Sequence, residues 1–119
     1  MTRRFPARVY GVGQEPDPRF TLANERTFLA WIRTALALIA GGVAVDAVAL
    51  PLPVGVRVAT AAVLLGLGLV LPVVAWLNWA AAERALRLGR PLPSSFVSLP
   101  LAGGVVLVAV LIVVGLLIR

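Results

Sequence analysis

The chain has 119 residues, of which 61% are hydrophobic and 13% charged, with a mean hydropathy of +1.00. A soluble domain of this length leaves about a third of its unfolded surface in water, too much for so apolar a composition. Eleven basic residues, all arginine, stand against five acidic ones and give a net charge of +6, with no cysteine or histidine. Disulfides, thiolate or imidazole metal sites and Ser/His or Cys/His catalytic pairs are therefore excluded, and we expect no cofactor.

Three stretches are long and apolar enough to cross a bilayer, which needs about 20 residues per helix. They run over about 22–49, 57–82 and 98–118, and connectors rich in proline and glycine separate them. We expect residues 1–16 to be a mobile basic cytoplasmic arm and residues 17–119 to be the membrane domain. The sequence thus predicts an all-α membrane protein with three transmembrane helices.

The arginines are concentrated on one side of these spans. Five lie in the N-terminal segment up to Arg26 and three in the second connector, whereas the first connector and the C-terminal residue have one each. The positive-inside rule therefore predicts a cytoplasmic N-terminus and second connector, with the first connector and the C-terminus outside. Because topology accounts for most of the charge, we expect no nucleic-acid partner.

The first span carries Arg19, Arg26 and Arg33 at intervals of seven residues. Two helical turns separate each pair, so the three side chains lie within about 40° on one face. The opposite face is mostly bulky and apolar. The face with the arginines also carries six small residues of this span: Ala23, Ala30, Ala37, Ala40, Gly41 and Ala44.

Two interpretations of the arginine face stay open. Arg33 lies about five residues, or roughly 8 Å, inside the apolar run that begins at Phe28. It can snorkel to the lipid headgroups. Alternatively, the face turns toward a water-filled or anion-filled space between helices, which the accompanying small residues favour.

Glu25 and Glu83 are the candidate charge-pairing residues. Glu25 lies about 100° from Arg26 on the same helix, so a neighbouring helix is its better partner. Glu83 ends the second span at a depth comparable with that of Arg26. We therefore expect a Glu83–Arg26 pair or a pair between Glu25 and an arginine of another copy, and a solvated Glu83 is the alternative.

Small residues also occur in the other two spans. Gly66 follows Ala62 by four residues, and Gly103 and Gly104 adjoin in the third span. Residues of this size let helix backbones approach closely, so we expect helix crossings at these glycines.

The run RFTLANERTFLAWIRTAL, residues 19–36, resembles the signature of the YidH-like inner-membrane family (domain of unknown function 202). The resemblance extends from Asp17 to the end of the chain. It implies a multi-pass protein of the bacterial inner membrane.

The chain is also similar to the membrane portion of the eukaryotic vacuolar transporter chaperone complex. That resemblance implies a homo-oligomer, a pentamer, of three-helix units around a pore that accepts polyphosphate from a cytosolic catalytic domain. Arg19 and Arg26 match its basic lining positions, and Glu25 matches the acid of the same motif. Arg33 belongs to the bacterial pattern only.

The chain departs from that complex in two ways. Trp79 is followed by Ala80 and not by a basic residue, so Arg84 or Arg87 is the candidate substitute. The 119 residues also include no phosphate-polymerising domain, so we expect this chain not to make the polymer.

Two functions follow from these patterns. The first is a homo-oligomeric conduit for anions such as phosphate or polyphosphate, lined by rings of guanidinium groups. The second is a non-catalytic scaffold or assembly subunit that binds anionic lipid or a partner membrane protein. An enzyme is not expected, because the sequence has no acid–base or nucleophile constellation. The candidate anion-binding or pore-lining residues are Arg19, Arg26, Arg33, Arg84 and Arg87.

Overall fold

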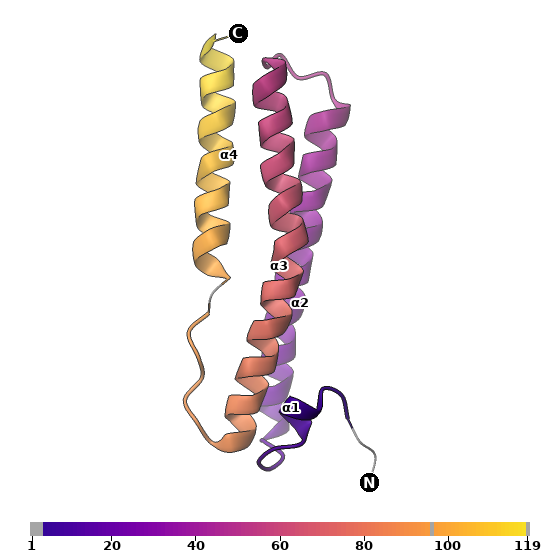
Figure 1. Ribbon diagram of the computed structural model, residues 1–119, viewed down its shortest axis with the longest axis vertical. Coiled ribbons are helices and arrows are strands. Elements are labelled where there is room, and N and C mark those ends of the chain that lie inside the picture. The colour runs from indigo at the N-terminus through magenta and orange to yellow at the C-terminus, as the bar shows by residue number, and fades with distance from the viewer. Residues whose placement is uncertain (1–3, 96, 119) are drawn as a thin grey trace.

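The computed structural model describes residues 4–95 and 97–118 and is an elongated helical bundle of 61 × 26 × 20 Å (Figure 1). Its three longest helices are all long and apolar enough to cross a membrane, which confirms the predicted three-span fold. The elements in chain order are α1 (Ala7–Tyr10), α2 (Pro18–Ala47), α3 (Val54–Leu88) and α4 (Ser98–Ile118).

The end of the bundle that carries the N-terminal arm is here called the arm end. Local sequence signals determine where α2 begins and α3 terminates there. Asp17 caps α2 by accepting a hydrogen bond from the Arg19 backbone N–H at 2.9 Å, and Pro18 occupies the first turn. Hydrogen bonds from the Arg19 side chain and backbone hold the pKa of Asp17 below its usual value. At the end of α3, Gly89 adopts a left-handed conformation with φ 67° and terminates the helix.

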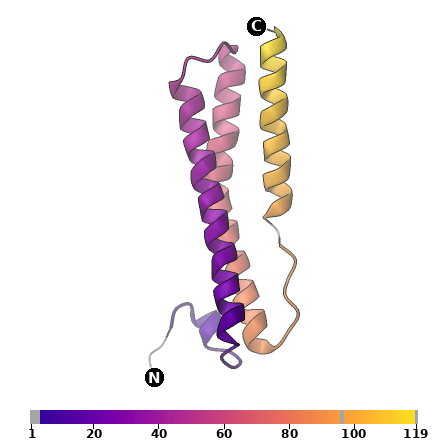
Figure 2. The same ribbon diagram turned by 180° about the vertical axis from the view of Figure 1, so that it is seen from behind.

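Helix α3 lies at the centre of the bundle, and both α2 and α4 pack against it. Helices α2 and α3 run antiparallel along most of their length, and α4 packs against α3 beside them (Figures 1 and 2). The buried cluster is small and consists of Ala35, Leu38, Leu71 and Val97. Most other large apolar side chains face outward, as expected where lipid is the solvent.

Helix α4 indicates where the apolar layer begins. Its 21 residues span roughly 31 Å, close to the thickness of a bilayer core. Val97, directly before α4, belongs to the same buried cluster as Ala35 and Leu71. Helices α2 and α3 therefore continue past the start of α4 and project from the layer at the arm end.

Glycines decide how closely the helices pack. A Cβ on Gly68 would lie 2.4 Å from Ile39 Cγ1, and one on Gly104 would lie 2.3 Å from Leu67 Cδ1. Gly104 thus confirms one expected crossing. The crossing expected at Gly66 is wrong, because no atom lies within 4 Å of a Cβ there. Gly68, two residues further along the helix, faces α2 in its place.

Replacing Gly68 by leucine should destabilise the protein, because the added side chain overlaps Ile39 in the α2–α3 contact. Overpacking of this kind costs about 1–3 kcal/mol in the free energy of unfolding. Thermal unfolding of purified Gly68→Leu in detergent should show a lowered midpoint. Gly66→Leu is the matched control and should unfold like the wild type; equal losses in the two variants would contradict this packing.

Candidate functional site

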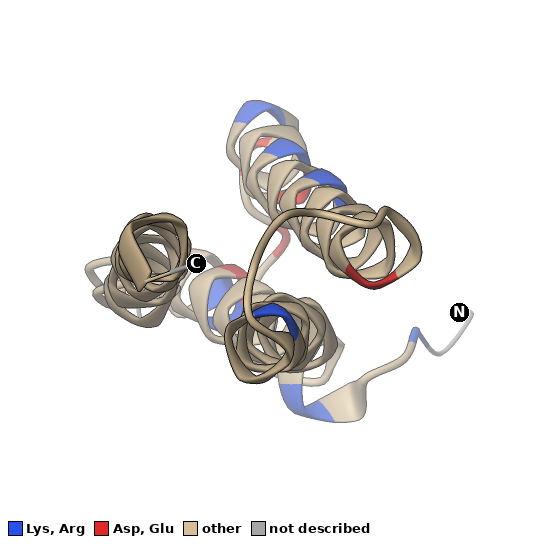
Figure 3. Ribbon diagram, turned by 90° about the horizontal axis from the view of Figure 1, so that it is seen from above, with Lys and Arg blue, Asp and Glu red and all other residues tan. Residues whose placement is uncertain are grey.

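The three arginines of α2 lie on a face that residues 4–95 and 97–118 leave uncovered. Arg19, Arg26 and Arg33 are all exposed, and Ala35 and Gly42, which are buried against α3, lie about 160–180° around the helix from Arg26. Figure 3 shows the basic segments of α2 along the side turned away from α3. The arginine face expected from the sequence is therefore present as an outer surface of the protomer.

The three arginines lie at different heights along the bundle. Arg33 lies two residues before Ala35, which shares a buried cluster with Val97, the residue directly before α4. Arg33 is therefore near the level at which α4 begins, and its distance from the lipid headgroups stays a prediction. Arg26 and Arg19 follow at steps of about 10 Å toward the arm end, so all three guanidinium groups can reach water without the cost of an arginine at the bilayer centre.

The partners of these arginines are few. Arg19 forms an ion pair with Asp17, with 2.8 Å between Nη2 and Oδ2. Over residues 4–95 and 97–118, Arg26 and Arg33 make no hydrogen bond or ion pair through their side chains. Glu25 is exposed and likewise has no ion-pair partner within that part of the protomer. A pair between Glu25 and an arginine of another copy stays a prediction.

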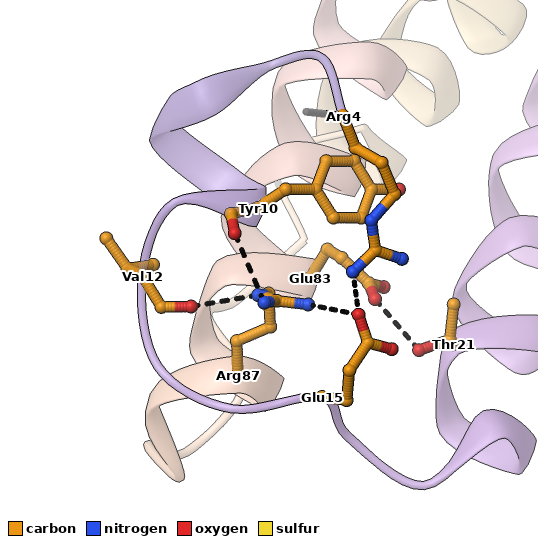
Figure 4. Close-up of polar contacts among 7 residues, drawn as sticks. All are labelled: Arg4, Tyr10, Val12, Glu15, Thr21, Glu83 and Arg87. Atoms are coloured by element: carbon orange, nitrogen blue, oxygen red, sulfur yellow. Dashed lines mark hydrogen bonds and ion pairs between the residues drawn. The ribbon is translucent and has the colours of Figure 1, made fainter. Parts of the chain in front are cut away.

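Glu83 lies behind the arginine face, between α2 and α3. Its side chain is 1% exposed. Its carboxylate accepts hydrogen bonds from Thr21 Oγ1 at 2.8 Å and from Asn24 Nδ2 at 3.2 Å. Figure 4 shows the first of these contacts. Both earlier interpretations of Glu83 are therefore wrong: it neither pairs with Arg26 nor lies in solvent.

This contact fixes the rotation of the first part of α2. Thr21 and Asn24 lie three residues apart, so they share one helix face, and Asn24 Nδ2 also donates to the Trp79 carbonyl at 3.1 Å. Holding this face against α3 turns Arg26 outward. The sequence contained a signal for the contact, because two polar side chains interrupt the mostly apolar face opposite the arginines, but it did not reveal Glu83 as their partner.

The N-terminal arm contacts Arg87, the buried basic side chain of α3. Arg87 is 9% exposed and donates from Nε to the Val12 carbonyl at 2.9 Å, from Nη2 to the Tyr10 carbonyl at 3.2 Å and from Nη1 to Glu15 Oε1 at 3.1 Å. Arg4 forms an ion pair with the same Glu15 carboxylate (Figure 4). Arg87 is therefore removed from the candidate anion-binding residues, because its guanidinium is already occupied.

Two further contacts hold the arm in place. Gln14 N–H donates to the Arg87 carbonyl at 3.0 Å, and Arg84 Nη1 donates to the Arg8 carbonyl at 2.6 Å. Gly13 adopts φ 59°, and a Cβ there would lie 2.0 Å from the Arg87 carbonyl oxygen. The described part of the arm thus contacts α3 in this structure, and its mobility stays a prediction. The side chain of Arg84 stays exposed.

No group of acidic side chains in the described ranges could hold a metal ion. An open groove of about 460 Å³ lies between Gly13–Pro16 and Leu86–Gly89, but its charged residues, Glu15 and Arg87, already pair with each other. The exposed arginines of α2 are therefore the strongest candidate site.

Removing the Glu83 carboxylate should destabilise the α2–α3 contact, because Thr21 and Asn24 lose their common acceptor. Buried groups left unsatisfied cost about 1–3 kcal/mol. Thermal unfolding in detergent should therefore show a lower midpoint for Glu83→Ala. Asp46→Ala, which removes an exposed carboxylate at the opposite end of α2, is the control and should leave the midpoint unchanged; the reverse order would contradict the contact.

Substitution of Gly13 should undock the arm, because alanine cannot adopt φ 59° without strain or fit beside the Arg87 carbonyl. Trypsin should then cut Gly13→Ala faster than the wild type after Arg87, as measured by mass spectrometry. Gln14→Ala keeps the backbone contact and is the control. Unchanged protection of Arg87 in Gly13→Ala would show that the arm does not cover it.

Comparison with known proteins gives consistent matches. A family model described as "Domain of unknown function (DUF202)" matches residues 19–85, a range that begins at Arg19 and includes Glu83. The chain is 42% identical over 112 residues to the inner membrane protein YidH of Escherichia coli K12, covering 92% of this chain and 95% of that protein. The YidH protein of Shigella flexneri matches with the same identity and coverage.

A more distant species gives a shorter match. An uncharacterized protein of Mycobacterium tuberculosis is 49% identical over 80 residues, which is 66% of each chain. No solved structure matches the chain.

Proposed function

The chain belongs to the DUF202 family and is an integral inner membrane protein, and we propose that it is a homo-oligomeric conduit for phosphate or polyphosphate-like anions. The exposed arginines of α2 form the mouth of this conduit at the arm end. Copies assemble with α2 toward a common axis and with α3 and α4 on the outside.

The proposal rests on a change from arginine to small residues along the uncovered face of α2. The residues in line with the arginines are small and exposed beyond Arg33, with the bulky Leu36 and Val43 beside them, and the change falls at the level where α4 begins. A face meant for lipid alone has no need of small residues, whereas small residues allow helices to approach closely or leave space along an axis. The exposed small residues in line with the arginines are Ala37, Ala40 and Ala44.

The chemistry of the mouth suits anions with several oxygens. A guanidinium group binds phosphate oxygens through two parallel charge-assisted hydrogen bonds. Arg26 and Arg33 are available for this, since neither has a side-chain partner in the part of the protomer that the structure describes. Repeated around an axis, they would concentrate anions before the narrower part of the path.

The other two long helices suit the outside of such an assembly. Their large apolar side chains face away from the bundle, for example Leu69 at 74%, Val73 at 60% and Leu117 at 79% exposure. Exposed side chains of this size are well solvated by acyl chains. This distribution supports placing α2, and not α3 or α4, at the axis.

A second candidate is a non-conducting scaffold that binds anionic lipid. It is favoured by the exposed side chains of Arg8 and Arg84 at the arm end, close to an aromatic group in which the Tyr10 and Trp79 rings lie 6.4 Å apart. Aromatic residues of this kind favour the headgroup region. Each arginine near an anionic surface contributes about 1 kcal/mol to binding.

Anion flux into liposomes tests the conduit. Purified protein should let radiolabelled phosphate or tripolyphosphate enter, and Arg26→Ala or Arg33→Ala should slow entry by about tenfold or more, because the mouth loses one charge per copy. Arg57→Ala removes an arginine at the opposite end of α3 and is the matched control.

Two outcomes would count against the conduit. Flux that is unchanged in a variant lacking Arg19, Arg26 and Arg33 would contradict it. Absence of flux combined with binding to vesicles of anionic, but not zwitterionic, lipid would support the scaffold in its place.

A further inference from the structure

Two buried side chains of opposite charge lie one helical turn apart on α3 and do not pair with each other. Glu83 is 1% and Arg87 9% exposed. Among residues 4–95 and 97–118, Arg87 forms an ion pair with Glu15 and Glu83 forms none. An acid four residues before a base is the favourable order for a pair on a helix. Because buried charges are costly unless they are paired, the separation of these two charges requires other partners for each.

Those partners come from two different segments. The carboxylate accepts hydrogen bonds from two uncharged donors of α2, Thr21 and Asn24. The guanidinium donates to three acceptors of the N-terminal arm, and its Cζ atom lies 5.5 Å from the centre of the Tyr10 ring. Figure 4 shows Arg87 among its arm partners, with Glu83 directed to Thr21. The arm and α2 therefore each hold one member of a potential ion pair.

The alternative partner of Arg87 is Glu83. Side chains of a helix tilt toward its N-terminus, so Arg87 extends over the turn that carries Glu83. The two residues lie about 40° apart around α3, and the sequence of this helix contains no other acid. If the arm leaves, the guanidinium loses its three acceptors and the carboxylate is the nearest charged acceptor. A carboxylate that is neutralised by a guanidinium binds uncharged donors less strongly.

We propose that the arm controls the contact between α2 and α3 through this choice of partners. While the arm binds Arg87, the Glu83 carboxylate holds Thr21 and Asn24. When the arm leaves, Arg87 takes the carboxylate and the first part of α2 is loosened. Linkage makes the coupling reciprocal, so loosening α2 also favours release of the arm. The inference concerns contacts within one protomer and does not depend on the conduit.

Hydrogen exchange of the full-length protein, measured by mass spectrometry, follows both contacts in one experiment. Residues 10–15 report on the arm, because the Gln14 N–H donates to the Arg87 carbonyl. Residues 18–27 report on the first part of α2, where local opening speeds exchange. Residues 35–45, further along α2, are the internal reference.

Two variants release the arm independently. Gly13→Ala disfavours the φ of 59° that docking requires, and Val9→Asn places an amide at a fully buried position of the arm. Each should speed exchange in residues 10–15. Each should also speed exchange in residues 18–27 by about fivefold or more, the usual lower size of such a coupling, and leave the reference segment unchanged.

Glu83→Gln separates the charge of this residue from its hydrogen bonds. Glutamine keeps an oxygen that can accept hydrogen bonds from α2 but offers no charge to Arg87. In this background, Gly13→Ala should still speed exchange of the arm but should have no further effect on residues 18–27.

The reciprocal effect is tested from α2. Asn24→Ala removes one donor to Glu83 and should speed exchange in residues 10–15. Thr27→Val is the matched control, because the Thr27 hydroxyl donates to the Ala23 carbonyl of its own helix. It should leave the arm unchanged.

Three results would overturn the proposal. Faster exchange of the arm with no change in residues 18–27 shows that the two contacts are independent. An equal effect of Gly13→Ala with and without the charge at position 83 shows that the arm does not act through Arg87. No change of residues 10–15 in either arm variant shows that the arm is not held by these contacts. None of these measurements involves flux, so their failure leaves the conduit proposal standing.

Discussion

The orientation of α2 depends on one buried carboxylate. Glu83 receives hydrogen bonds from Thr21 and Asn24, at 2.8 and 3.2 Å, where the two long helices leave the apolar layer. A carboxylate buried to 1% exposure needs such donors, because burial without them is costly. Because this face of α2 packs against α3, the three arginines on the opposite face lie on the outer surface.

The lipid that surrounds the long helices explains why they pack loosely. The buried apolar cluster among the described residues is small, and glycines such as Gly68 bring helices together where the contact is closest. In lipid, exposing leucine and valine costs little, so helix association depends on close approach and on polar contacts at the ends. The polar contacts of this protein are concentrated at the arm end, where α2 and α3 project from the layer.

The arginines of the described residues have different contacts although they look alike in the sequence. Arg87 is a structural residue whose guanidinium binds arm carbonyls and Glu15, whereas Arg26 and Arg33 have no partner in the described part of the protomer. Arg33 lies near the level at which α4 begins. A basic, water-accessible surface that leads to a row of alanines is the basis of the proposed conduit, and its cargo and subunit number stay predictions.

Composition and periodicity alone were enough for the three spans and the arginine face of α2, because hydropathy and helical phase are local properties of a chain. The family was indicated by the resemblance of residues 19–36 to a known signature. The partners of Glu83, the docking of the arm on Arg87 and the height of Arg33 relative to α4 could not be obtained in this way. Each depends on residues more than fifty positions apart and on the offset between helices, which hydropathy leaves undefined. Gly66 and Gly68 illustrate the point: both are small and two residues apart, but only the rotation of α3 against α2 decides which of them is in contact.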